Sequence, residues 1–273
     1  MTLRSHLWAD LTRSEIAAAR DAGALVVIPI GATEQHAEHL PVGTDSLTSG
    51  RLSLMAAEAC DILVLVAPTI SVAFSPHHAS WPGTLTLSLP TLRALIGDIT
   101  ASIERVGFKR QLLVNGHGGN RAPLSSICLE LVAAGRAVGF VDYFAPPAAE
   151  LNAIMSGGKG GVTHAAEAET SLVMALEKHD ADKLAFYRRQ AQGLEASAAR
   201  AQRLGKAPNP VTRAGGWWAN LYLDDGPGYN GDPAQGSVEK GDRMIAAITE
   251  KLADFFAIYA AAELKTGPST PSL

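Results

Sequence analysis

Apolar runs alternate with amphipathic stretches along the first half of the chain. Four runs have the length of strands that are covered on both faces, and they occupy residues 25–30, 62–67, 111–114 and 137–143. Apolar side chains recur at helical spacing in three further stretches, at residues 44–59, 90–105 and 122–134. Strands that alternate with helices in this way predict βαβ units, in which a mostly parallel sheet carries helices on both faces. The fold class predicted from the pattern is therefore α/β.

Shorter elements accompany this pattern. Thr12 and Glu15 have the spacing of a capping box, which predicts a short helix over residues 14–21. Residues 71–83 are typical of a loop, and residues 84–88 alternate like a short exposed strand.

The second half of the chain is less regular, although three stretches in it are predicted to be helical, at residues 163–178, 180–213 and 244–264. The middle stretch is charged and rich in Ala, as expected of a surface arm or an oligomer contact. No internal repeat or convincing boundary interrupts the chain. We therefore expect one domain over residues 1–265, followed by a disordered tail at 266–273.

Composition excludes several classes of protein. The 273 residues are 47% hydrophobic and 18% charged, which is typical of a globular protein. A net charge of −4 gives no electrostatic attraction for nucleic acid or an anionic membrane. Neither a signal peptide nor a membrane span is evident, and the two cysteines, Cys60 and Cys128, are expected to be free thiols. These features predict a cytoplasmic location.

Side chains with metal-binding chemistry follow the first predicted strand. Glu34 and His36 lie two residues apart, so on an extended segment both point to the same side. Asp45 comes after a Pro-Val-Gly-Thr turn that can bring the chain back towards them. Carboxylate oxygens and imidazole nitrogens are ligands suited to zinc, manganese or iron. The alternative is a solvated polar loop with no ligand.

A second polar cluster follows the third predicted strand, in the sequence Asn115-Gly-His117-Gly-Gly-Asn120. In parallel sheets, ligand-binding residues lie just beyond the carboxyl ends of strands, where Glu34 and His36 also fall. Two such clusters favour a metal site over a polar loop, although a tight turn would also explain His117. The two asparagines are expected to fix this loop by hydrogen bonds.

Two other groups of residues allow more than one interpretation. His164, Glu167 and Glu169 lie around the start of a predicted helix, where a carboxylate often only complements the helix dipole. Trp217 and Trp218, with Tyr222, belong to the core, to a pocket wall or to an interface, and we favour the last two. His6, His39 and His179 are expected on the surface or around the site.

Five segments together resemble the creatininase (creatinine amidohydrolase) family. They are Gly31-Ala-Thr-Glu-Gln-His36 with Asp45, Pro82-Gly-Thr84 after His77-His78, Asn115–Asn120, His164-Ala-Ala-Glu-Ala-Glu-Thr170, and Gly231-Asp-Pro233 with Glu239-Lys-Gly241. The resemblance implies a three-layer α/β/α fold, a binuclear metal site that hydrolyses a carbon–nitrogen bond of a small molecule, and a homohexamer.

Each site residue has a role that the resemblance implies. One divalent ion, zinc or manganese with iron as a further possibility, would be held by Glu34, Asp45 and His117. The other would be held by His36, Glu169 and the shared Asp45. His164 would be the general acid/base, and His78 is the second choice for donating a proton to the leaving nitrogen.

The chain departs from members of the family that act on creatinine itself. Where this chain has Gly118 and Gly119, the similar enzymes that act on creatinine carry an aromatic residue and a metal-binding Glu. The second carboxylate must therefore come from elsewhere in the chain, and Glu169 is expected to supply it, with Glu167 as the alternative. Residues 158–163 also lack the tryptophan that creatinine enzymes have before the active-site His. The substrate expected is a small, cyclic amide other than creatinine, with a formamide, a short peptide, or a cyclic ketone or lactone as alternatives.

Two rival functions use the same residues differently. Glu34, His36 and His117 could hold one iron in a mononuclear, non-hydrolytic enzyme, but Asp45 and Glu169 would then have no role. A nucleotide-binding protein could use the Gly-rich loop after the third strand, but that loop lacks the Gly-x-Gly-x-x-Gly spacing.

Overall fold

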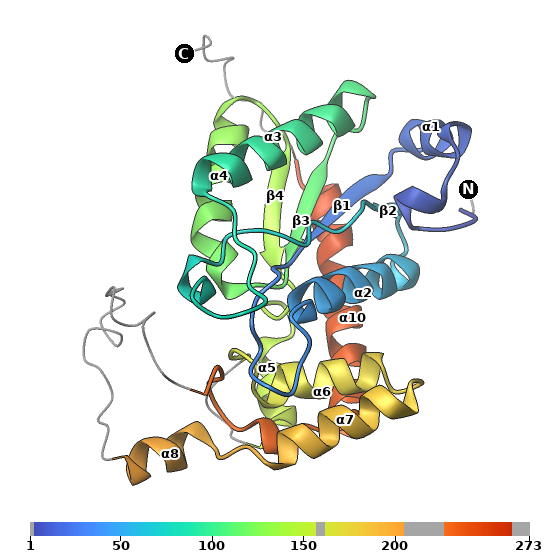
Figure 1. Cartoon of the computed structure of the whole chain (residues 1–273). Helices are drawn as coiled ribbons and strands as arrows, with labels where there is room; N and C mark the ends of the chain where they lie inside the picture. Colours follow the sequence, from blue (N-terminus) through green and yellow to red (C-terminus); the bar gives the residue numbers. More distant parts are fainter. Residues whose placement is uncertain (1–2, 157–161, 205–226, 264–273) are drawn as a thin grey trace.

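A four-stranded parallel sheet forms the centre of the computed structural model, which describes residues 3–156, 162–204 and 227–263 (Figure 1). The strand order is β2-β1-β3-β4, with β1 at Leu25–Ile30, β2 at Val64–Val66, β3 at Gln111–Asn115 and β4 at Val138–Asp142. Ile30 pairs with Asn115, so β1 and β3 end at the same level. The loops that follow these two strands therefore start side by side.

Helices cover both faces of the sheet, which confirms the predicted three layers. They are α1 Arg13–Asp21, α2 Thr44–Ala59, α3 Leu89–Arg105, α4 Arg121–Ala133, α5 Ala148–Ile154, α6 Glu167–Leu176, α7 Ala181–Gln192, α8 Ser197–Arg203 and α10 Val238–Ala261. Successive strand residues face opposite sides. Val26 and Ile28 pack towards α1, α3 and α4, whereas Leu25 and Val27 pack towards α2 and α10. Complete burial of such a Val or Ile side chain stabilises the fold by about 1.5–3 kcal/mol.

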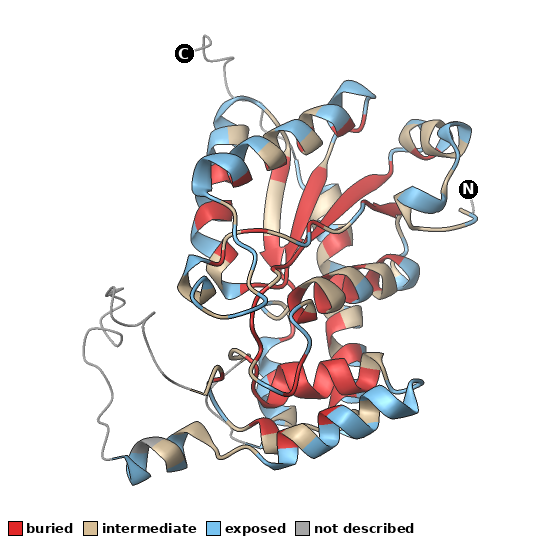
Figure 2. Ribbon diagram, viewed as in Figure 1, coloured by how far each residue is buried: buried red, intermediate tan, exposed pale blue. Residues whose placement is uncertain are grey.

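Helix α6 lies beyond the sheet and is buried along nearly its whole length (Figure 2). It packs against α10, α2 and α7. The contact with α10 is very close at Gly241, where a Cβ atom would lie 2.0 Å from the carbonyl oxygen of Ser171. Only glycine permits this approach, and it holds the second turn of α6, just after Glu169, against α10.

Several predicted boundaries differ from the structure. The capping box of Thr12 and Glu15 is confirmed, and both of its reciprocal bonds are present. The strand predicted at 84–88 is wrong, because only Leu85 makes a bridge, to Thr33. Helix α5 was not predicted. The helical stretch predicted at 180–213 is broken at Gly193 into α7 and α8, and α8 extends away from the rest of the molecule (Figure 1). Residues 205–213 lie outside the described part.

Other sequence expectations have mixed outcomes. Cys60 and Cys128 are free thiols, as predicted, although Cys60 is only half-buried. None of the described helices is both long and apolar enough to cross a membrane. Trp217, Trp218, Tyr222 and the tail 266–273 lie outside the described residues. The single domain over 1–265 remains a prediction.

Candidate active site

Five side chains from four segments meet beyond the carboxyl ends of β1 and β3. Glu34 and His36 come from the loop after β1, Asp45 from the first turn of α2, His117 from the loop after β3, and Glu169 from the first turn of α6. Each of them is at most 7% exposed. The parallel sheet explains this convergence, because its strand ends deliver both loops to one edge.

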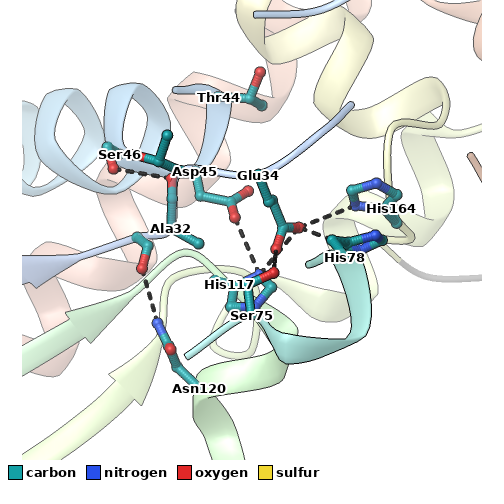
Figure 3. Close-up of polar contacts among 12 residues, drawn as sticks. Ala32, Glu34, Thr44, Asp45, Ser46, Ser75, His78, His117, Asn120 and His164 are labelled. Atoms are coloured by element: carbon teal, nitrogen blue, oxygen red, sulfur yellow. Dashed lines mark hydrogen bonds and ion pairs between the residues drawn. The ribbon is translucent and has the colours of Figure 1, made fainter. Parts of the chain in front are cut away.

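Asp45 lies between two histidines and turns one carboxylate oxygen towards each. Its Oδ1 atom is 3.1 Å from His36 Nε2. Its Oδ2 atom is 3.1 Å from His117 Nδ1 (Figure 3). Each oxygen of this carboxylate is therefore available to a different ligand group.

Glu34 faces three histidines with a single oxygen. Its Oε1 atom is 3.3 Å from His117 Nδ1, 3.3 Å from His164 Nδ1 and 3.6 Å from His78 Nε2 (Figure 3). The other oxygen accepts a hydrogen bond from the Ser75 hydroxyl, which fixes the plane of the carboxylate. Both histidines that were considered for proton transfer, His164 and His78, therefore lie beside a candidate metal ligand.

The two carboxylates at the start of α6 have different surroundings. Glu169 Oε2 lies 3.5 Å from His36 Nε2 and accepts a hydrogen bond from the Ala165 backbone at 2.6 Å. Glu167 points away from this cluster and accepts from Lys240 Nζ at 2.6 Å and from the Ser156 backbone. Of these two candidates for the second carboxylate, the structure brings only Glu169 to the other four residues.

Hydrogen bonds to backbone carbonyls orient both histidines of the cluster. His36 Nδ1 is 3.0 Å from the Glu34 carbonyl oxygen, and His117 Nε2 is 3.2 Å from that of Phe74. A carbonyl can only accept, so each imidazole donates there. The opposite nitrogen of each ring then faces the carboxylates, as is typical of metal-binding histidines.

The pKa values follow from burial and from the density of charge. Burial alone would lower the pKa of His36 and His117, but the facing carboxylates outweigh it and raise these values to about 9 and about 10. Burial raises the pKa of Glu34, yet hydrogen bonds from His117 and His164 bring it well below its usual value. Burial also raises the pKa of Glu169. Three buried carboxylates in one cluster need positive charge beside them.

The cluster fits divalent metal ions. Asp45 Oδ2 is fully buried and accepts no hydrogen bond of good geometry, although His117 Nδ1 is close to it. Potential ligand atoms of Glu34, His36 and Asp45 lie within 4.8 Å of one another, as do those of His36, His164 and Glu169. Buried carboxylate and imidazole ligands of this kind suit zinc or manganese.

Two glycines of the loop after β3 differ in the space around them. A Cβ atom on Gly119 would lie 2.3 Å from His117 Nε2 and 2.6 Å from His77 Cε1, whereas one on Gly118 would meet nothing within 4 Å. Gly119 is therefore closely packed, whereas Gly118 borders open space. Asn115 and Asn120 fix the loop as predicted, because Asn115 Oδ1 accepts from the His117 backbone and from the Asn120 amide.

Several residues of the site have no role in the prediction from sequence. His77 stacks on His117 with ring centroids 5.4 Å apart, and Gln35 bonds to both His78 and His164. Two features of the sequence could have indicated these roles. One is the pair His77-His78 in a loop, and the other is the position of Gln35 between two candidate ligands. His39 is fully buried and bonds to Thr170, next to Glu169, so of its two expected positions it takes the one around the site and not the one on the surface.

Comparison with known proteins identifies the family. The family model described as creatininase (creatinine amidohydrolase) matches residues 9–256. The chain belongs to the creatininase family. It is an enzyme, a metal-dependent hydrolase of a family whose members act on carbon–nitrogen bonds.

Individual members of the creatininase family are similar to this chain to different extents. A mycofactocin precursor peptide peptidase of Mycolicibacterium smegmatis is 28% identical, over 84% of this chain and 83% of its own. A 3-dehydro-scyllo-inosose hydrolase of Thermotoga maritima is 32% identical over 34% of this chain and 30% of its own. A creatinine amidohydrolase structure shares the fold with a TM-score of 0.77 and 23% identity, covering 95% of this chain and 100% of the other.

Proposed function

We propose that this creatininase-family hydrolase uses two divalent metal ions to hydrolyse the carbon–nitrogen bond of an amide. The observation that carries the proposal is Asp45, whose two oxygens each face a different histidine at 3.1 Å. One ion would be held by Glu34, Asp45 and His117, and the other by His36, Asp45 and Glu169. Zinc and manganese are the ions that we propose.

Divalent ions held by these residues would supply Lewis acidity and would lower the pKa of water. The side chains of the protein would supply the other parts of the reaction. Burial holds the carboxylates of Asp45 and Glu34 in place, and the Ser75 hydroxyl also donates a hydrogen bond to Glu34. These candidate ligands therefore need little rearrangement to bind metal. His164 is 18% exposed at its side chain and lies at the edge of the cluster, where it can reach a substrate carbonyl or leaving nitrogen. His78 stacks on it with ring centroids 4.3 Å apart and is the second candidate for this role.

The bond cleaved is proposed to belong to a small cyclic amide other than creatinine. Gly118 supports this choice, because the family members that act on creatinine are expected to carry a larger residue there. A short peptide is the second candidate, favoured by the mycofactocin precursor peptide peptidase, which matches more than four fifths of both chains. The open space beside Gly118 leaves room for a longer substrate.

Metal content and hydrolysis should be measured together. The protein is purified without chelator or affinity metal, and its metal is quantified by elemental analysis. It is then assayed on lactams, formamides, short peptides and lactones with zinc or manganese. The proposal predicts about two ions per chain and metal-dependent release of an amine or an opened ring. One ion per chain, or none after reconstitution, would contradict the binuclear site.

Location and assembly are further parts of the proposal. Free Cys60 and Cys128 support a reducing compartment such as the cytoplasm. A homohexamer is proposed from the resemblance of the chain to its family. Sedimentation of the purified protein would test the assembly.

A further inference from the structure

Gln35 is a buried amide between two candidate metal ligands, Glu34 and His36. Its side-chain Oε1 accepts a hydrogen bond from the Ala37 backbone N–H at 2.8 Å. Its Nε2 lies 3.1 Å from His78 Nδ1 and 2.9 Å from His164 Nε2. Because a backbone N–H can only donate, the oxygen of the amide must face Ala37. The NH2 group, with its two protons, must then face the two imidazoles.

This orientation determines where each imidazole carries its proton. A nitrogen that faces an N–H donor must offer its lone pair, so His164 Nε2 and His78 Nδ1 are acceptors. In the neutral rings the protons then lie on His164 Nδ1 and His78 Nε2. These are the nitrogens that face Glu34 Oε1, at 3.3 Å and 3.6 Å. Gln35 therefore directs two N–H groups towards the candidate metal cluster.

Contacts from separate segments hold Gln35 in place. Ala37 has a φ of +53°, a left-handed conformation that an alanine rarely adopts, and it brings its N–H onto the Gln35 oxygen. The Gln35 backbone donates to Thr84 Oγ1 at 3.1 Å. On the other side, Gly228 packs so closely that a Cβ atom there would lie 2.4 Å from Gln35 Oε1. A side chain that only filled space would not need an amide between a donor and two acceptors.

We propose that Gln35 is a positioning residue that fixes the tautomers of His164 and His78, so that both donate hydrogen bonds from the nitrogens that face the cluster. This inference rests on the proposed hydrolysis, because it assigns a role within that reaction. It restricts the acid/base role expected for His164 to that of a hydrogen-bond donor through Nδ1. From these positions the two N–H groups stabilise the oxygen on which negative charge develops when an amide carbonyl is attacked.

Nitrogen NMR of the zinc-loaded protein tests the proposal directly. The chain is labelled with ring-¹⁵N histidine, and the resonances are assigned with His164→Ala and His78→Ala variants. The proposal predicts a protonated Nδ1 and an unprotonated Nε2 in His164, and the reverse in His78. A protonated Nε2 in His164 would overturn it. This readout needs no substrate, so it still decides the proposal if the proposed hydrolysis fails.

Two replacements of similar size then test the consequence for catalysis. Gln35→Met removes the donors, and Gln35→Glu offers the imidazoles only acceptors when it is ionised. We expect both to alter the His164 tautomer and to lower kcat about tenfold or more, with KM and the metal content little changed. Gln111→Met is the matched control, since Gln111 is a buried glutamine whose amide donates to the Thr100 carbonyl at the other end of β3. Unchanged tautomers and kcat in folded Gln35→Met would refute the proposal.

Discussion

Glu167 and Glu169 lie in the same turn of α6, yet their carboxylates contact different parts of the molecule. Glu169 faces His36, whereas Glu167 is bonded to Lys240 and to the Ser156 backbone. One residue therefore belongs to the candidate metal cluster, and the other joins α6 to α10 and to the end of α5.

The two carboxylates should respond differently to removal of their charge. Glu169→Gln is expected to lower the metal content from about two ions per chain towards one and to abolish turnover. Glu167→Gln should keep both ions but destabilise the fold by about 1–3 kcal/mol, because Lys240 loses a buried charged partner. Elemental analysis and urea unfolding measure the two effects. Loss of metal in Glu167→Gln alone would reverse the assignment.

Removal of the His164 imidazole should separate metal binding from turnover. We expect His164→Ala to keep both ions and to lose about 10²–10⁴-fold in kcat, because the residue lies at the edge of the cluster and is not assigned as a ligand. His179→Ala, at an exposed position after α6, is the matched control and should behave as wild type. Full activity in His164→Ala would transfer the role to another residue such as His78.

Metal binding should release protons. In the metal-free protein the pKa values of His36 and His117 are raised to about 9 and about 10, so both imidazoles are charged at neutral pH. A metal ion binds only the neutral ring, so about two protons must leave on binding. Apparent affinity should therefore rise with pH between 6 and 8. Calorimetry in buffers of different ionisation enthalpy counts these protons, and a heat independent of the buffer would contradict the prediction.

The two glycines that follow His117 offer a matched pair of substitutions. Gly119→Ala places a methyl group against His117 and His77, so we expect a destabilisation of about 1–3 kcal/mol and a large loss of activity. Gly118→Ala meets open space and should fold and bind metal as wild type does. Thermal unfolding and metal content of the two variants can be compared directly. Equal effects would show that the loop has a different conformation.

The positions of the strands and of most candidate ligands were predictable because they depend on local pattern. The apolar run Leu25–Ile30 was predicted with its observed bounds, since a strand buried on both faces has no polar residue until it ends. Glu34, His36 and His117 follow from the rule that parallel strand ends share one edge of the sheet.

Other features depend on contacts between residues far apart in sequence. The choice between Glu167 and Glu169 depends on Lys240, 73 residues beyond Glu167, and the spacing of the two carboxylates carries no trace of it. The role of Gln35 depends on which end of its amide meets Ala37, and a glutamine in a sequence does not show this. The short strand expected at 84–88 failed because alternation alone does not provide a partner strand.

The close contact between α6 and α10 has a consequence for the order in which the site can be assembled. Four of the five candidate ligands have been synthesised once the chain reaches residue 117, but Glu169 lies on α6, which packs closely against Gly241 of α10. A nascent chain that ends before α10 therefore carries candidate ligands that cannot yet form a complete centre. We therefore expect the complete five-residue cluster to form only after α10 has been synthesised and has packed against α6.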